Sequence, residues 1–192
     1  MAALIAAARD PDFPAEIVLV VSNRPNAPGL SLARDAGVRA IAIDHRPFAG
    51  DRAAHEAAIE VALRDARAEL VCLAGYMRLL TPFLVGAWRG RMLNIHPSLL
   101  PAFPGLDTHA RALAAGVKLH GCTVHLVTQT MDEGPILAQA AVPVLPDDTA
   151  ETLADRVLVQ EHILYPRALR CVASGDRGVA PLRNVALGNP VA

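Results

Sequence analysis

Short apolar runs alternate with alanine-rich amphipathic stretches through the first half of the chain. The apolar runs predict strands at residues 17–21, 38–43, 70–74 and 91–95. The stretches between them predict helices at residues 30–36, 51–70 and 83–88, the second with a buried face of Ala57, Val61 and Leu63. Because strands that alternate with helices are typical of parallel sheets, this pattern predicts an α/β fold with an open, mostly parallel sheet.

The second half of the chain follows a different pattern. Alternating apolar and β-branched residues at 121–127 and 136–144 predict two paired strands, joined through an acidic Gly-Pro turn. Asp107 is expected to cap a helix that runs to about residue 115. The residues from 174 onward contain glycine and proline and are expected to form a loosely ordered tail. Before them, a last amphipathic helix is predicted over residues 149–172, with Leu153, Val157, Val159 and Ile163 on or near one face.

Length, composition and charge limit the classes of function. A chain of 192 residues suits one compact domain over residues 1–192, and 53% hydrophobic residues are enough to bury a core. The net charge of -1 provides no general attraction to nucleic acid or to an anionic membrane, and no apolar run approaches the ~20 residues of a membrane span. Cys72, Cys122 and Cys171 are widely spaced, which favours a reducing, cytoplasmic location over a disulfide framework or a zinc site.

Three polar residues are candidates for catalysis. Asn94 and His96 lie two residues apart at the end of a predicted strand, so their side chains project from the same face. Open parallel sheets bind ligands at this carboxyl edge. An amide donor and an imidazole aimed at one point suit acyl transfer, in which a carbonyl becomes a tetrahedral oxyanion. Asp132, in an acidic loop, is placed to pair with His96 and to favour its protonated form.

These and other polar residues also have structural interpretations. A single Asn or His at a strand end is usually structural, but the Asn-x-His spacing before a loop with Pro97, Pro101 and Pro104 favours a functional role. His125 is expected to be a core histidine or one that supports a site residue. Cys122 is expected to be a small buried hydrophobic residue rather than a nucleophile. The seven histidines show no spacing typical of metal ligands.

Six segments together closely resemble the signature of glycinamide ribonucleotide formyltransferases, and they cover nearly the whole chain. They are LAGYMRLLTP at residues 73–82, LNIHPSLLP at 93–101, FPGLDTH at 103–109, HGCTVH at 120–125, MDEGP at 131–135 and QEH at 160–162. The resemblance implies a Rossmann-like formyltransferase fold with helices on both faces of the sheet. It also implies transfer of a formyl group from 10-formyltetrahydrofolate to the amine of glycinamide ribonucleotide in de novo purine biosynthesis.

The same resemblance implies roles for individual residues. Asn94 and protonated His96 would stabilise the oxyanion, while Asp132 orients His96 and helps to move the proton through water. Gln160 and Glu161 would contact the ribonucleotide, and no metal is implied. Arg52, otherwise a solvated residue at a helix start, would join the folate pocket. The implied folate pocket consists of Arg52, Met77, Arg78, Leu79, Leu80, Asn94, Gln129, Thr130, Met131 and Asp132.

The chain differs from this family at its N-terminus. The family opens with a short strand and a Gly-x-Gly-Ser-Asn loop that holds a phosphate at a helix start, whereas residues 1–5 align with the interior of the first helix. We therefore expect a sheet without its first strand and a helix that begins at Met1 without a capping side chain. We also hypothesise that the natural protein begins upstream. A chain that begins here is expected to show weak turnover and poor solubility.

Three other functions share parts of this pattern. A methionyl-tRNA formyltransferase would carry an added nucleic-acid-binding domain and a basic surplus. A formyltetrahydrofolate hydrolase would usually carry an N-terminal regulatory domain. A truncated folate-binding domain would keep the pocket without turnover. The FPGLDTH segment at residues 103–109 fits the glycinamide ribonucleotide enzyme better than the first two relatives.

Overall fold

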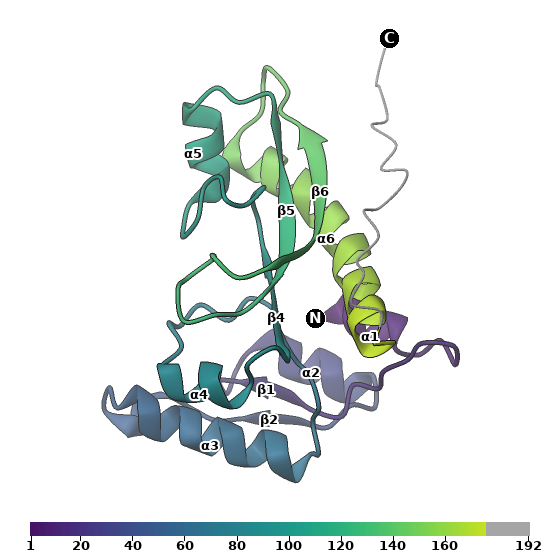
Figure 1. Cartoon of the computed structure of the whole chain (residues 1–192), viewed down its shortest axis with the longest axis vertical. Helices are drawn as coiled ribbons and strands as arrows, with labels where there is room; N and C mark the ends of the chain where they lie inside the picture. The colour runs from purple at the N-terminus through teal and green to yellow at the C-terminus, as the bar shows by residue number, and fades with distance from the viewer. Residues whose placement is uncertain (176–192) are drawn as a thin grey trace. The chain divides into compact units, whose positions relative to one another are not determined.

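The structure, a computed structural model, describes residues 1–175 and divides into two compact units (Figure 1). The first unit comprises Met1–Leu93 with Val127–Gln129, and the second comprises Asn94–Leu126 with the residues from Thr130 onward. Most of the expected tail lies outside the described residues, of which Ser174 and Gly175 are the last two. The single domain over residues 1–192 stays a prediction.

The first unit contains the strand and helix alternation that the sequence predicts. Strands β1 (Val20–Ser22) and β2 (Ala40–Ala42) form a parallel pair, with Val21 opposite Ile41, and β3 (Val71–Leu73) belongs to a different sheet. Strand β4 (Met92–His96) starts in this unit. The N–H of Val71, the first residue of β3, donates to the carbonyl of Arg91, the residue before β4. The helices are α1 (Ala2–Ala7), α2 (Pro28–Asp35), the short 3-10 helix η1 (Arg46–Phe48), α3 (Arg52–Asp65) and α4 (Pro82–Ala87).

Two expectations for this unit are confirmed. The α/β class with parallel pairing is present, although β1, β2 and β3 are each shorter than the apolar run that predicted them. Helix α1 begins directly after Met1, and the Met1 side chain makes no capping hydrogen bond.

Helix α3 buries a different face from the predicted one. Ala57 is exposed and Val61 is 59% exposed, so the prediction for these two residues was wrong. The physical reason is that two glutamates take the interior positions. The buried residues of α3 are His55, Glu56, Ile59, Glu60 and Leu63.

The two buried glutamates of α3 are tolerated because they are hydrogen-bonded. Thr81 donates both its N–H and its hydroxyl to Glu56, and the indole N–H of Trp88 donates to Glu60. Hydrogen bonds of this kind offset the cost of removing a carboxylate from water. The helix pair α3 and α4, side by side in Figure 1, encloses the core cluster of Ile59, Leu63, Leu84, Trp88 and Met92.

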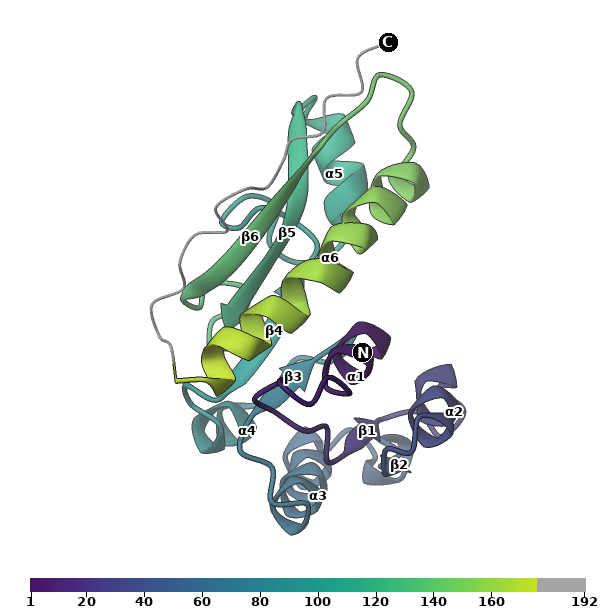
Figure 2. The same ribbon diagram turned by 90° about the vertical axis from the view of Figure 1, so that its right-hand side faces the viewer.

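The second unit is built on an antiparallel hairpin. Strands β5 (Leu119–Leu126) and β6 (Ile136–Pro143) pair in register, with an irregularity at Val124 and His125, so the predicted strand pair is confirmed. Helix α6 (Ala150–Ala173) lies along this hairpin in Figures 1 and 2. Thr149 and Thr152 cap its first turn reciprocally. Within the described residues, no helix is long and apolar enough to cross a membrane.

Two of the four residues that were predicted to lie on the buried face of α6 are buried in the structure. Leu153 and Val157 are buried, but Val159 is 57% exposed and Ile163 is 42% exposed, so the prediction for these two was wrong. At 3.6 residues per turn, both positions point away from the stripe that continues from Leu153 and Val157. The stripe is completed by Leu164, Tyr165, Ala168 and Leu169.

The proline-rich loop after β4 packs closely against the hairpin at Gly121. A Cβ atom at Gly121 would lie 1.9 Å from the carbonyl oxygen of Ala140 and 2.9 Å from Cδ2 of Leu99. Only glycine therefore permits this approach of backbone and loop.

Helix α5 (Thr108–Ala114) follows the loop and starts in an unusual way. Asp107 occupies the N-cap position, but its φ is 55° and its side chain makes no capping hydrogen bond. The prediction that Asp107 caps this helix was therefore wrong. An N-cap residue normally has an extended backbone, which aims its side chain at the first free N–H groups, and the left-handed conformation removes that geometry.

Candidate active site

Strand β4 ends with two of the candidate residues, and the loop before β6 supplies the third. Asn94 and His96 are the third and fifth residues of β4, and Asp132 lies in the turn that joins β5 to β6. The Oδ2 atom of Asp132 lies 3.5 Å from Nδ1 of His96, and both side chains are more than nine-tenths buried. The structure therefore brings together the imidazole and the carboxylate that the sequence suggested as partners.

His125 links Asn94 to this pair. Its Nδ1 lies 3.1 Å from the carbonyl of Leu126, so Nδ1 is the donor, and its Nε2 lies 3.2 Å from Nδ2 of Asn94, from which it accepts. Burial lowers the pKa of His125, which agrees with this neutral state. Because the amide of Asn94 is fixed at one N–H, its second N–H keeps a defined direction.

The loop after β4 contacts both His96 and Asp132. Nε2 of His96 lies 3.0 Å from the carbonyl oxygen of Phe103, and the N–H of Gly105 donates to Oδ2 of Asp132 at 2.8 Å. His96 thus faces an acceptor at each ring nitrogen. A protonated imidazole, which donates at both nitrogens, matches these two acceptors.

A buried network holds this loop in place. The hydroxyl of Thr123 donates to the carbonyl of Ser98 at 2.7 Å and accepts from the N–H of Leu100 at 3.0 Å. The side-chain amide of Gln139 donates to the carbonyl of Leu100 at 2.8 Å and to Thr123 at 3.0 Å. Sequence reasoning missed this network, because no local pattern indicates that β5 and β6 hydrogen-bond to the loop.

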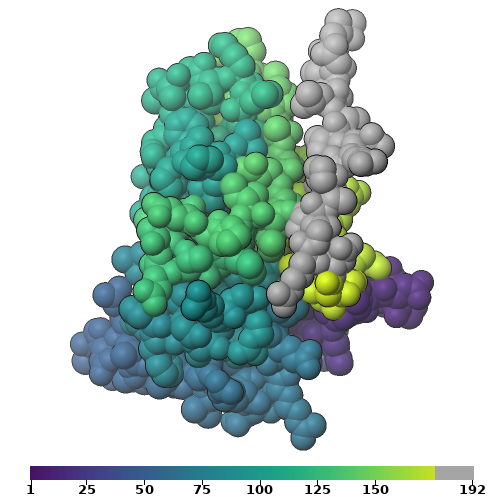
Figure 3. Space-filling view, viewed as in Figure 1, coloured from purple at the N-terminus to yellow at the C-terminus, as the bar shows by residue number. Residues whose placement is uncertain are grey.

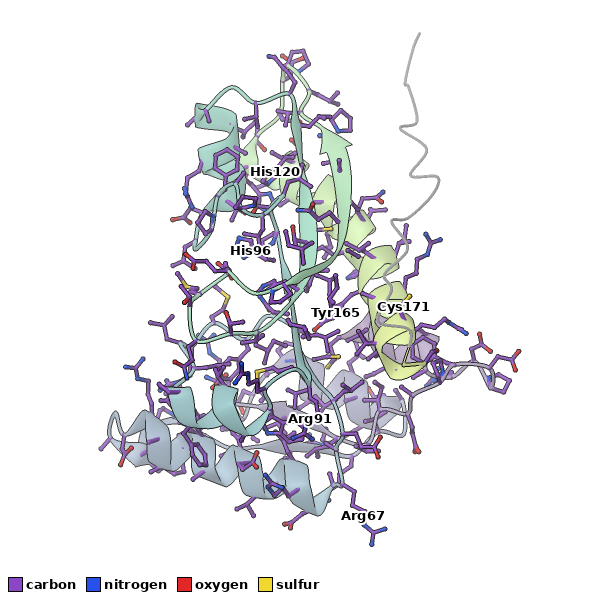
Figure 4. The ribbon with its side chains drawn as sticks, viewed as in Figure 1. Arg67, Arg91, His96, His120, Tyr165 and Cys171 are labelled. Atoms are coloured by element: carbon purple, nitrogen blue, oxygen red, sulfur yellow. The ribbon has the colours of Figure 1, made fainter. Side chains whose placement is uncertain are left out.

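A second histidine pair borders the site. Nε2 of His120 lies 3.2 Å from Nδ1 of His109, and Nδ1 of His120 is buried without a hydrogen-bond partner within the described residues. Burial, with a smaller contribution from His109, lowers the pKa of His120 to about 4. His96, labelled with His120 in Figure 4, also lowers the pKa of His120 by electrostatic repulsion. Both histidines lie in segments used for the resemblance, but nothing in the sequence predicted their contact.

The residues implied for the folate pocket are mostly exposed within their own units. In the first unit, Met77 is 75% exposed and Leu79 is 59% exposed. Leu80 instead packs against the core cluster of that unit. Arg52 and Gln129 are exposed and Arg78 is partly exposed.

In the second unit, Thr130 and Met131 are exposed in the loop that carries Asp132. Figure 3 shows atoms of this loop, coloured green, on the surface. Gln160 and Glu161 are half-buried on α6, and burial raises the pKa of Glu161.

The described residues show neither a cluster of metal ligands nor, at Cys122, a thiolate nucleophile. No group of three or more His, Cys, Asp and Glu side chains among residues 1–175 is arranged to hold a metal ion. Cys122 is fully buried, and burial raises the pKa of its thiol to about 12, so it is not a thiolate nucleophile at neutral pH. The polar cluster of Asn94, His96, His125 and Asp132 is therefore the candidate site.

Comparisons with known proteins identify the family to which the chain belongs. The family described as formyl transferase matches residues 1–169. The chain is similar to the trifunctional purine biosynthetic protein adenosine-3 of Drosophila melanogaster, at 46% identity over 93% of this chain and 13% of that protein. It is also similar to phosphoribosylglycinamide formyltransferase of Escherichia coli, at 41% identity over 90% of this chain and 81% of that protein.

A solved structure is similar along most of both chains. It is phosphoribosylglycinamide formyltransferase from Brucella melitensis, with 59% identity, a TM-score of 0.86, and coverage of 91% of this chain and 90% of that chain. The chain therefore spans a small part of the Drosophila protein and most of the two bacterial proteins.

Proposed function

Because the chain belongs to the formyl transferase family, we propose that it transfers a formyl group from 10-formyltetrahydrofolate to the amine of glycinamide ribonucleotide. The proposal is carried by one observation, the buried pair of His96 and Asp132 beside the amide of Asn94. Both bacterial relatives reported above bear the name of this reaction.

In the proposed reaction, the amine attacks the formyl carbon and the carbonyl oxygen becomes an oxyanion. The free N–H of Asn94 and the protonated imidazole of His96 would donate to that oxygen, and Asp132 would keep the imidazole charged and oriented. The bond from the formyl carbon to the folate nitrogen then breaks. One proton leaves the attacking amine and one reaches the folate nitrogen, with Asp132 and water as the carriers. The site needs no metal for these steps.

The ligand-binding residues complete the proposal. Exposed apolar side chains such as Met77 and Met131 suit the flat rings of a folate, and Arg52 and Arg78 suit its carboxylates. Gln160 and Glu161 are half-buried polar groups that suit the amide and amine of the ribonucleotide. Both partners are small molecules. We also propose a cytoplasmic location, where three thiols outside any disulfide remain reduced.

Hydrolysis of formyl-folate is the second candidate, because the same oxyanion donors serve when water replaces the amine. The products separate the two reactions. Transfer yields a formylated ribonucleotide, whereas hydrolysis yields formate and needs no ribonucleotide.

The test is an assay of formyl transfer that follows both products. Wild-type protein is expected to formylate glycinamide ribonucleotide, and His96→Ala is expected to lower kcat by about 10²–10³. His45→Ala, which removes an imidazole that contacts Asn23 in the first unit, is the matched control and should retain wild-type activity. Equal rates for wild type and His96→Ala would remove His96 from the mechanism. Formate production without ribonucleotide would favour hydrolysis.

A further inference from the structure

The loop at residues 103–106 holds the candidate catalytic pair from two sides. Its first residue, Phe103, gives its carbonyl to His96, and Gly105 gives its N–H to Asp132. Both contacts come from backbone atoms, so the geometry of the pair depends on the conformation of this loop. A substitution that leaves His96 and Asp132 intact can therefore still misplace them.

The backbone of this loop and of the residue after it has an unfavourable conformation at two residues that are not glycine. Phe103 has a φ of 53°, Asp107 has a φ of 55°, and Gly105 has a φ of 80°. The left-handed region is unfavourable for a bulky side chain such as phenylalanine and is populated only where surrounding contacts enforce it. Some other part of the unit must therefore hold Phe103 in this conformation.

Arg111, near the end of α5, makes such contacts. Its guanidinium donates from Nη1 to the carbonyls of Pro104 and Leu106. It also lies 5.7 Å from the centre of the Phe103 ring, on the ring's face. A second neighbour of this ring is His120, at 6.0 Å between ring centres in an edge-to-face arrangement. Phe103 is thus contacted by both Arg111 and His120.

We propose that Arg111 is a positioning residue for the catalytic pair: it holds the loop at 103–106 in the conformation that presents the Phe103 carbonyl to His96 and the Gly105 N–H to Asp132. Its contribution to formyl transfer rests on the proposed function, whereas its effect on His96 does not. An exposed helix arginine is often only a solvated side chain. Arg111 differs because its head group reaches back to carbonyls that precede its own helix.

The geometry of guanidinium determines which substitutions are informative. Arg111→Met keeps an aliphatic chain but removes every donor and the charge. Arg111→Lys keeps a charge but replaces the planar fork by a single ammonium, which stacks poorly on a ring. Lysine should therefore restore part of the function that methionine loses.

Arg91 provides a matched control from the first unit, where Figure 4 labels it. Its Nη2 donates to the carbonyl of Ala87 at 2.9 Å, and its guanidinium lies 4.8 Å from the centre of the Trp88 ring. It thus combines a backbone carbonyl and an aromatic face, as Arg111 does, without contacting the loop at 103–106. A general effect of losing such an arginine should appear in both variants.

The experiment combines nitrogen-15 NMR of histidine side chains with steady-state kinetics of formyl transfer. In wild type, the Nε2–H of His96 should give a slowly exchanging proton signal, assigned by its absence in His96→Ala. Arg111→Met should lose that signal and lower kcat about tenfold, with KM changed less than about twofold. Arg111→Lys should lie between, and Arg91→Met should match wild type in both measurements.

Each other outcome decides the proposal. If Arg111→Met shows the same His96 signal and the same kcat as the control Arg91→Met, Arg111 does not position the pair. If wild type does not formylate the ribonucleotide, the NMR comparison still tests the positioning of His96 while the proposed function fails. Should Arg111→Met fail to fold, Arg111→Lys takes its place, and a wild-type His96 signal with wild-type kcat in that variant would overturn the proposal.

Discussion

The two units both bury polar side chains, but they satisfy them to different degrees. In the first unit, Thr81 donates its N–H to Glu56 at 2.8 Å, Trp88 donates to Glu60 at 2.5 Å, and His55 contacts the carbonyl of Ile43 at 2.8 Å. In the second unit the Thr123 network is equally short, but the contacts among the histidines and Asp132 of the candidate site and its border are longer or missing. His96 and Asp132 are 3.5 Å apart, His125 and Asp132 are 3.8 Å apart, and one nitrogen of His120 has no hydrogen-bond partner within the described residues.

The contrast separates polar groups that hold a fold from polar groups that can act on a ligand. A buried carboxylate with short, complete hydrogen bonds stabilises the contact between two helices and has little capacity left. A group with long contacts retains hydrogen-bonding capacity, and catalytic contacts often tighten only when a substrate binds. We therefore expect substitution of Glu56 to change stability, and substitutions of Asn94, His96 and Asp132 to change activity.

The largest effect is expected for the amide of Asn94. Asn94→Asp keeps the shape but places a carboxylate where the oxyanion forms, so kcat should fall by about 10³ or more, measured as formyl transfer at saturating substrates. Asn23→Asp is the matched control, since Asn23 also contacts a histidine, at 3.3 Å, but in the first unit. A similar loss of activity in both variants would remove the distinction between the units.

A stability effect of intermediate size is expected for Glu56. Glu56→Ala leaves the N–H and hydroxyl of Thr81 without their acceptor in a buried position, which should cost about 2–4 kcal/mol of unfolding free energy in urea denaturation. Activity per folded molecule should remain close to wild type. The exposed Glu69 serves as a control, and Glu69→Ala should change stability by less than about 0.5 kcal/mol. A loss of activity without a loss of stability in Glu56→Ala would contradict this assignment.

A smaller effect is expected from pH. Burial lowers the pKa of His120 to about 4 from an ordinary value of 6.5, so the unfolded chain binds the proton more readily. Stability should therefore be full above about pH 6.5 and should fall by about 1–3 kcal/mol as pH drops towards 4. Urea denaturation at several pH values should show a weaker dependence in His120→Gln. His162→Gln, at an exposed position, is the control and should keep the wild-type pH dependence of stability. An unchanged pH dependence of the unfolding free energy in His120→Gln would contradict the prediction.

The order and type of the elements could be predicted because they depend on local periodicity. The apolar runs at β1, β2 and β3 and the alternating pattern of the antiparallel pair β5 and β6 were all visible in the sequence. Arg64 pairs with Glu60 locally, but the buried face of α3 could not be predicted, because Thr81 lies 25 residues after Glu56 and Trp88 lies 28 residues after Glu60. Sequence patterns assume that charged residues stay outside, which fails when such distant partners exist.

The candidate site was predictable in part. The Asn-x-His spacing and the acidic turn indicated Asn94, His96 and Asp132 before any coordinates, and the structure places the imidazole and the carboxylate together. The contacts around them were not predictable, because they depend on a left-handed backbone at Phe103. Nothing in the residue type of phenylalanine indicates that conformation.

The most direct test of the division between the units is Asp132→Asn, measured for both formyl transfer and unfolding free energy. The amide keeps the size of the carboxylate and can still accept from the N–H of Gly105, but it cannot balance the positive charge that the proposed reaction assigns to His96. We predict a fall in kcat of about 10³ with a change in unfolding free energy below about 1 kcal/mol. Near-wild-type transfer by Asp132→Asn, or a loss of stability as large as that expected for Glu56→Ala, would contradict the account.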